Sequence, residues 1–381
     1  MLLTAVPAGR WAAPRLRQGA DGRTPRWKAG VAAAGLTLVL IGVAELVPAP
    51  VAEERPTPAI GDADRATGWV EVPDPPAAQV GTAESVSPSV TRRDVPYVIG
   101  AELGCPGPGV DAACSGSQTL DIYKAPGTGQ HPVALWVHSG GWVAGDKNNL
   151  SDPVLRLYRR GFDVVSVNYR LSDGYRRARF PTAVLDTKAA VRWVKANAEQ
   201  HGFDADAILA IGGSAGGYLV QMVATTAGEP GLEPTVGLSA EQRVESSRVA
   251  AAVSFSGMCD LCAMVGDGHG WSPGLVEAFL GCPADCSEPL LTTASATSYV
   301  TADDAPVYAV TGSQDTLALP RVSDLLGAAY VRAGIGHRFF DDAVDSGDPG
   351  CWGHNPWCGT NVAAFDEFVD AGRGSSAQPG R

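Results

Sequence analysis

The sequence has few positive charges and no uninterrupted apolar run long enough to cross a membrane. Its 381 residues contain 29 Lys and Arg against 41 Asp and Glu, which gives a net charge of −12 at pH 7. Phosphate backbones repel a chain with this balance, so we exclude nucleic acid as a partner. The apolar stretch from Val31 to Ala44 has about 14 residues, fewer than the roughly 20 that span a bilayer as a helix.

The basic residues gather at the N-terminus. The first 44 residues contain six basic groups and a single acid, Asp21, and they end in the apolar stretch. This order predicts an export signal at residues 1–44, with Gly42-Val43-Ala44 as a cleavage site. An uncleaved anchor that extends past Glu45 is the main alternative, and a buried core helix is the third. The first two predict a protein that is secreted or membrane-anchored on the extracytoplasmic side.

The eight cysteines form groups that are local in the sequence, at positions 105, 114, 259, 262, 282, 286, 351 and 358. In an exported protein this pattern predicts disulfides. Cys105 with Cys114 and Cys351 with Cys358 are the expected short bridges, whereas pairing among the middle four is open. Their C-x2-C and C-x3-C spacing also resembles a zinc ribbon, and free thiols are a further alternative.

Composition divides the rest of the chain. Residues 45–94 are rich in Pro, Ala, Thr and Ser and predict a disordered tether, followed by a folded domain at 95–373 and a flexible tail at 374–381. Within the domain, strands are predicted at 120–123, 133–138, 163–169, 207–211, 249–255, 306–311 and 337–340. Helices are predicted to end near 160 and 226 and to span 181–199, 322–333 and 361–371.

Strands that alternate with helices predict an α/β fold, with a mostly parallel, doubly wound sheet covered on both faces. One segment interrupts the alternation. Met258 to about Val300 lies between two late strands and contains four cysteines with several Gly and Pro. We predict that this cysteine-rich insertion forms a lid over the carboxyl edge of the sheet.

The clearest chemical motif is Gly212-Gly213-Ser214-Ala215-Gly216-Gly217, directly after the strand at 207–211. Its G-x-S-x-G frame is typical of a nucleophile elbow, in which a sharp strand-to-helix turn exposes a serine. Glycine is common in this chain, with 46 residues, so a plain glycine-rich loop is the alternative. Ser214 would need a base and donors for an oxyanion.

Two backbone segments are candidates for the oxyanion donors. The N–H of Ala215 follows the nucleophile, and those of Gly140 and Gly141 lie in a glycine-containing loop after the strand at 133–138. His138, which opens this loop, is expected to support it. Trp142, which follows the glycines, is predicted to contact the substrate.

The acid and the base are expected on later loops. Asp315 follows the strand at 306–311, and Asp260, after the preceding strand, is the alternative acid. The chain order Ser, Asp, His leaves His337 and His354 as candidate bases. His337 begins a strand pattern, whereas His354 lies in a loop rich in Gly and Pro, so we predict the triad Ser214, Asp315 and His354.

Together these segments resemble the α/β-hydrolases of the esterase and lipase group, including the hormone-sensitive-lipase-like and feruloyl-esterase-like carboxylesterases. The shared pieces, in the family's order from about Leu120 to Ala371, are HSGGW with GDK, Tyr169-Arg170-Leu171, Phe180-Pro181 with Asp186, GGSAGG, and the segments of Asp315 and His354. The resemblance implies an α/β-hydrolase fold and a structural role for Asp186. The chain departs from the family where Ser139 replaces a glycine.

The function that the resemblance implies is hydrolysis of small-molecule acyl esters through a Ser-His-Asp triad and an acyl-enzyme, with no metal or cofactor. An amidase or prolyl-oligopeptidase-like peptidase is the alternative because that clan also uses G-x-S-x-G-G, although this chain lacks the large N-terminal propeller of many such peptidases. A non-catalytic binding module on the same fold is the third interpretation, and the presence of all three triad residues disfavours it. The sequence indicates no oligomeric state.

Overall fold

A computed structural model describes residues 88–101, 116–172, 178–266, 273–282, 286–335, 337–342, 353–357 and 359–375. All of them lie in the compact unit from Glu71 to Arg381. The predicted signal or anchor and most of the predicted tether lie outside the described residues. The two predicted bridges Cys105–Cys114 and Cys351–Cys358 lie outside them as well.

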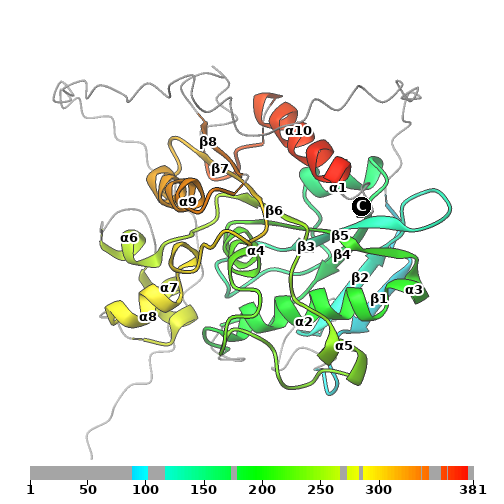
Figure 1. Ribbon diagram of the computed structural model, residues 1–381. Coiled ribbons are helices and arrows are strands. Elements are labelled where there is room, and N and C mark those ends of the chain that lie inside the picture. The colour runs from blue at the N-terminus through cyan, green and yellow to red at the C-terminus, as the bar shows by residue number, and fades with distance from the viewer. Residues whose placement is uncertain are drawn as a thin grey trace, which may run out of the picture. The chain divides into compact units, whose positions relative to one another are not determined.

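An eight-stranded sheet in the order β1-β2-β4-β3-β5-β6-β7-β8 organises this unit (Figure 1). β2 pairs antiparallel with both neighbours, and every pair from β4 through β8 is parallel. The strands are β1 (Arg92–Pro96), β2 (Thr119–Tyr123), β3 (His131–Val137), β4 (Asp163–Val167), β5 (Phe203–Gly213), β6 (Ala251–Phe255), β7 (Val307–Gly312) and β8 (His337–Asp342). The predicted mostly parallel sheet is confirmed.

The edge strand β1 was not predicted, and the tether was predicted to continue to residue 94. β1 pairs with β2 from Arg92, so the folded unit begins earlier than expected. Its sequence, RRDVP, is mostly exposed and has no alternation of apolar and polar residues. An edge strand that faces solvent needs little apolar surface, which explains why the pattern gave no strand signal.

Helices cover both faces of the sheet, as the alternation predicted. Buried side chains of α2, α4 and α9 pack on one face, and those of α1 and α10 pack on the other. The helices outside the insertion are α1 (Asp152–Arg159), α2 (Thr182–Ala196), α3 (Ala198–His201), α4 (Ala215–Thr225), α5 (Ala240–Val244), α9 (Pro320–Ala333) and α10 (Gly359–Ser375). The end of α10 includes residues 374 and 375, which were predicted to belong to the flexible tail.

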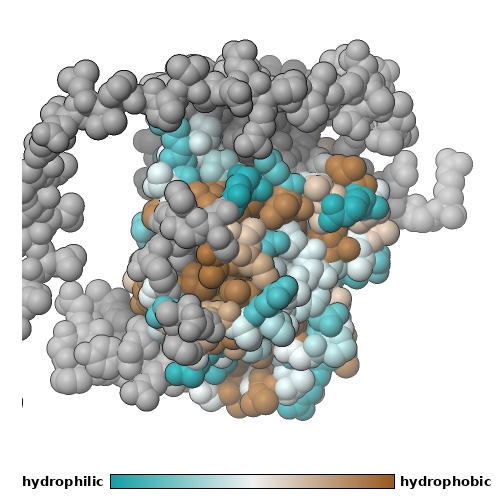
Figure 2. Space-filling model, turned by 90° about the vertical axis from the view of Figure 1, so that its left-hand side faces the viewer, coloured by the Kyte–Doolittle hydropathy of each residue, from teal (hydrophilic) through white to brown (hydrophobic). Residues whose placement is uncertain are grey.

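The cysteine-rich insertion connects β6 to β7 through short helices. These are α6 (Leu261–Gly266), α7 (Pro273–Leu280), α8 (Glu288–Thr293) and the short 3-10 helix η2 (Ala296–Ser298). They lie together with α9 on one side of the sheet (Figure 1). Seen from that side, hydrophobic residues gather in the middle of the surface (Figure 2). Val265 on α6 and Leu325 on α9 are both partly exposed hydrophobic residues of these helices.

The insertion contains one disulfide and two free thiols. Cys282 and Cys286 are bonded, with their Cα atoms 5.3 Å apart. Cys259 and Cys262 are free, so among the middle four cysteines the favoured disulfide forms for one pair, and the free-thiol alternative holds for the other two. The Cys259 thiol is fully buried and donates a hydrogen bond to the carbonyl of Val322, 2.8 Å away. Burial raises the pKa of this thiol well above its usual value.

We expect the two free thiols to differ in reactivity. A thiolate is the reacting species, so the buried Cys259 with its raised pKa should resist iodoacetamide in the native protein, whereas the partly exposed Cys262 should react. Both should react in denaturant. Mass spectrometry of the alkylated peptides measures this difference, and a disulfide-linked peptide containing Cys259 and Cys262 would contradict the structure.

Candidate active site

Ser214 lies at the turn where β5 ends and α4 begins. Its backbone has φ 52° and ψ −118°, a conformation that residues other than glycine rarely adopt. The Ser214 N–H donates to the carbonyl of Phe255 at the end of β6, with a separation of 2.7 Å, and its own carbonyl accepts from Tyr218 in α4. The strained residue is thus held by the neighbouring strand and by its helix. Strain of this kind concentrates at functional sites.

The glycines around Ser214 are required by close backbone contacts. A Cβ on Gly212 would lie 2.4 Å from the carbonyl carbon of Gly216, and one on Gly216 would lie 2.0 Å from the carbonyl oxygen of Val137. A Cβ on Gly217 would meet the carbonyl oxygen of Phe255 at 2.9 Å. The helix therefore packs directly on the ends of β3 and β6, and only glycine fits.

Replacing Gly216 by Ala should destabilise the protein strongly. The new Cβ would meet the carbonyl oxygens of Val137 and His138, at 2.0 and 2.7 Å, and neither can rotate away because both belong to the backbone. We expect a loss of about 3 kcal/mol in the free energy of unfolding, the upper end of the usual cost of overpacking, measured in urea. Gly353→Ala is the control, since a Cβ there meets nothing within 4 Å. Equal stability of the two variants would contradict the tight elbow.

His354 connects Ser214 to Asp315. Nε2 of its ring lies 2.9 Å from the Ser214 Oγ, and Nδ1 lies 2.8 Å from the Asp315 Oδ2. Asp315 follows β7, and its other oxygen accepts hydrogen bonds from the N–H groups of Leu317 and Ala318, at 2.8 and 3.0 Å. The structure thus brings together the serine, histidine and aspartate that were predicted as a triad, although they come from three separate loops.

The charge on Asp315 determines which nitrogen of His354 carries the proton. Burial raises the pKa of Asp315. The hydrogen bond from His354, the positive charge that His354 can carry, and the N–H groups of Ala318 and Leu317 all lower it. The lowering effects are larger, so the pKa of Asp315 lies below its usual value. At neutral pH the carboxylate can only accept hydrogen bonds. Nδ1 of a neutral His354 therefore carries the proton, and Nε2 presents a lone pair to Ser214.

The glycine-containing loop after β3 lies beside the elbow. Gly140 has a φ of +122°, and a Cβ on it would meet the Ala144 carbonyl oxygen at 2.0 Å. The hydroxyl of Ser139 donates to the carbonyl of Gly213, 2.9 Å away. Ser139, the residue that departs from the family pattern, therefore links this loop to the peptide just before Ser214.

Side-chain contacts support this loop at its start and farther along. The ring of His138 stacks on Tyr169, with centroids 4.4 Å apart, and its Nδ1 donates to the Ser139 carbonyl at 2.7 Å. Farther along, Lys147 is buried and forms ion pairs with Asp94 and Asp121, at 2.7 and 2.9 Å. The loop is thus held at its start by Tyr169, which follows β4, and farther along by Asp94 of β1 and Asp121 of β2.

Trp142 occupies a different place from the predicted one. Its side chain is 0 % exposed and stacks on Phe279 of α7, with ring centroids 4.1 Å apart. Its indole also meets the edge of Tyr218 in α4. The prediction that Trp142 contacts the substrate is therefore wrong, because the ring packs between the loop, the insertion and α4.

A cavity of about 600 Å³ opens over Ser214. Its walls include Ser214, His354, Gly140 and Gly141, and also Asp146 of the GDK segment, together with residues to which the sequence assigned no role in a site: Leu275, Leu317, Trp136, Asn149, Ser151 and Asn355. Asn355 was detectable as the neighbour of His354. Leu275 carried no sequence signal, because it lies in an insertion without a regular pattern.

Asp260, the alternative acid, has a structural role. One of its oxygens accepts from the Ala263 N–H at 2.9 Å, and the other accepts from the Thr297 hydroxyl at 2.8 Å. It therefore ties the start of the insertion to η2. Asp186 likewise accepts hydrogen bonds from the backbone and guanidinium of Arg170, which agrees with the structural role implied for it. Within the described ranges, no group of three or more His, Cys, Asp or Glu could hold a metal ion.

Comparisons with known proteins place the chain in a family. The family model described as BD-FAE matches residues 120–330, more than half of the sequence. The probable carboxylic ester hydrolase LipM of Mycobacterium tuberculosis is 32% identical over 52% of this chain and 45% of its own length. Esterase LipQ of the same organism is 29% identical over 74% of this chain and 61% of its own length.

The chain thus spans about half the length of the curated relatives it matches. Among solved structures, a truncated form of a carbohydrate esterase from gut microbiota aligns with a TM-score of 0.59 and 24% identity, covering 77% of this chain and 99% of that one. At this identity the likeness extends to the fold. The chain therefore belongs to the BD-FAE family, and it has the α/β-hydrolase fold that its motifs implied.

Proposed function

We propose that the protein is a serine carboxylesterase that hydrolyses acyl esters through Ser214, His354 and Asp315. The observation that carries the proposal is the hydrogen-bonded chain from Asp315 through His354 to a serine held in a strained turn at a helix N-terminus. The names of LipM and LipQ, a probable carboxylic ester hydrolase and an esterase, support the same reaction class.

In the first step Ser214 acts as the nucleophile. Nε2 of His354 takes the Ser214 proton while Oγ attacks the ester carbonyl carbon, and the carbonyl π electrons move to oxygen as the tetrahedral oxyanion forms. The Asp315 carboxylate stabilises the imidazolium that results and keeps the ring in place. The distance of 2.9 Å between Nε2 and Oγ suits this proton transfer without a rearrangement.

The oxyanion is stabilised by backbone N–H groups. Ala215 is the first residue of α4, and N–H groups in the first turn of a helix have no partner within it. The positive end of the helix dipole lies at the same point. Gly140 and Gly141, which line the cavity beside Ser214, supply the other donors. Loss of one such donor typically lowers the rate by about 10²–10³.

Departure of the alcohol and release of the acid complete the cycle. The imidazolium of His354 returns its proton to the alcohol oxygen as the carbon–oxygen bond breaks, which leaves an ester between the acyl group and Ser214. His354 then takes a proton from water, the hydroxide attacks the acyl carbon, and the Ser214 oxygen leaves with the proton. Every proton transfer in this cycle takes place at Nε2 of His354, while Nδ1 stays hydrogen-bonded to Asp315.

A panel of substrates tests this function. The purified protein is expected to hydrolyse short p-nitrophenyl esters, with little action on the matching anilides or on peptides. Faster hydrolysis of the anilides or of peptides would indicate the amidase or peptidase interpretation. Absence of hydrolysis with every substrate, in a folded sample, would favour the non-catalytic binding module.

For the location of the protein, we propose that the described unit functions outside the cytoplasm, secreted or held at the membrane by the N-terminal segment. The Cys282–Cys286 disulfide supports an oxidising compartment. Within the part of the chain that the structure describes, no helix is both long and apolar enough to span a bilayer. Cell fractionation with an antibody against the folded unit tests the proposal, and recovery in the cytosol alone would contradict it.

A further inference from the structure

We propose that Leu275, carried by the cysteine-rich insertion, sets the acyl chain length that the site accepts and favours short acyl groups. The inference rests on the proposed esterase function and adds a specificity determinant to it. The residue is partly buried, lines the cavity together with Ser214 and His354, and comes from α7, which lies outside the motifs of the active site.

Leu275 is in contact with the segment that supplies the oxyanion donors. Its Cδ1 lies 3.0 Å from the position that a Cβ on Gly141 would take, and its Cδ2 lies 3.4 Å from it. The leucine side chain therefore fills the space that the missing side chain of Gly141 leaves open. A substrate carbonyl that binds to the N–H of Gly141 has the methyl groups of Leu275 beside it.

The chemistry of the two ester halves indicates which half meets Leu275. The alcohol oxygen has to lie near Nε2 of His354, because that nitrogen returns the proton to it. The polar residues Asn355, Asn149 and Asp146 also line the cavity. Leu275, carried by α7, lies against Gly141 of the oxyanion loop, so the group packed against it is the acyl chain attached to the carbonyl carbon.

Aromatic packing holds α7 in this position. Phe279, one turn after Leu275, is fully buried, stacks on Trp142 at a centroid distance of 4.1 Å and meets the edge of Tyr218 at 5.4 Å. The Phe279 carbonyl accepts a hydrogen bond from the N–H of Phe180, 2.7 Å away. Because Trp142 directly follows Gly141, the same aromatic stack aligns the oxyanion loop and the helix that carries Leu275.

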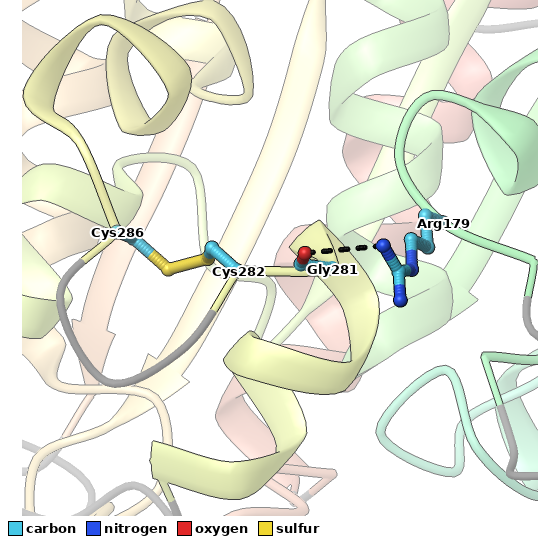
Figure 3. Close-up of a disulfide and its surroundings, with 4 residues drawn as sticks. All are labelled: Arg179, Gly281, Cys282 and Cys286. Atoms are coloured by element: carbon cyan, nitrogen blue, oxygen red, sulfur yellow. Dashed lines mark hydrogen bonds between the residues drawn. A yellow bond between two sulfur atoms is a disulfide. The ribbon is translucent and has the colours of Figure 1, made fainter. Parts of the chain in front are cut away.

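The end of α7 is fixed by a second set of contacts, shown in Figure 3. The guanidinium of Arg179 donates to the Gly281 carbonyl, with a separation of 3.3 Å, and the disulfide Cys282–Cys286 follows directly. The stem of Arg179 lies where a side chain on Gly281 would be, since a Cβ there would lie 2.0 Å from the Arg179 Cδ. These contacts make the position of Leu275 a fixed property of the insertion.

The test varies the acyl and the alcohol halves of the substrate separately. For Leu275→Ala, we expect the ratio of kcat/KM for p-nitrophenyl octanoate to that for p-nitrophenyl acetate to rise by about 10- to 100-fold, as for other changes in the size of an apolar pocket. Leu275→Phe should lower the same ratio. A series of acetate esters that differ only in the alcohol should show no comparable change.

Leu325→Ala is the matched control, because this leucine of α9 is partly exposed at 42 % and lies outside the cavity wall. Its octanoate-to-acetate ratio should equal that of the wild type. An unchanged ratio in both Leu275 variants would overturn the proposal, and so would a change confined to the alcohol series. These outcomes are distinct from failure of the esterase function, in which the wild type hydrolyses none of the esters.

Discussion

Replacing Ser214 by Ala is expected to lower kcat for ester hydrolysis by about 10⁶, the size of effect that removal of a triad nucleophile has in other serine hydrolases. The oxygen that attacks the carbonyl is lost, and the Nε2 lone pair of His354 has no hydroxyl to activate. Steady-state kinetics with a p-nitrophenyl ester measure the effect, with the enzyme concentration raised to detect the residual rate.

The same variant should remain folded, which separates lost chemistry from lost structure. Ser214 makes no side-chain cap to α4, and its side chain bonds to His354, so its removal costs about 1 kcal/mol in the free energy of unfolding. Alanine has the same Cβ as serine and adds no strain at the positive φ of this position. Activity within a few-fold of the wild type would contradict the assignment of Ser214.

The second large effect is expected for Asp315→Asn, with a loss of about 10⁴ in kcat. An asparagine oxygen can still accept the N–H groups of Leu317 and Ala318, so the loop keeps its shape. The amide NH₂ of the asparagine then faces Nδ1 of His354, so Nδ1 has to accept a hydrogen bond instead of donating one. The proton moves to Nε2, and the ring can no longer take the Ser214 proton.

Asp260→Asn is the control for this variant. The replacement removes a carboxylate that also lies in a loop after a strand of the sheet, but the oxygens of Asp260 accept from Ala263 and Thr297 within the insertion. Its kcat should stay close to that of the wild type. If Asp260→Asn lowered kcat as much as Asp315→Asn, the choice of Asp315 as the partner of His354 would be wrong.

The elbow and the sheet could be predicted from the sequence because their signals are local. A Cβ added to Gly212 or Gly216 would lie only 2.0–2.4 Å from backbone atoms. Glycine at these two positions therefore indicates the close backbone approach of the elbow. The five-residue strands β4 and β6 are buried at every position and mostly apolar, as parallel strands covered on both faces should be. Asp315 and His354 were found because each follows a predicted strand.

Other features depend on tertiary contacts that leave no local pattern. Trp142 follows the oxyanion glycines and was expected at the substrate, but Phe279 from a segment far along the chain covers it. The pairing of Cys259 and Cys262 was left open by the sequence, and both are free in the structure, with Cys259 against the backbone of α9. Leu275 reaches the cavity only because that aromatic packing positions α7.

The central claim is that Ser214 is an activated nucleophile, and labelling with a fluorophosphonate tests it most directly. The reagent reacts with serines whose proton is taken by a base and whose oxyanion is stabilised. We predict stoichiometric labelling of the wild type, with the added mass on the peptide that contains Ser214, and no labelling of Ser214→Ala. A folded wild type that stays unlabelled, or that carries the mass on another serine such as Ser139, would contradict the account.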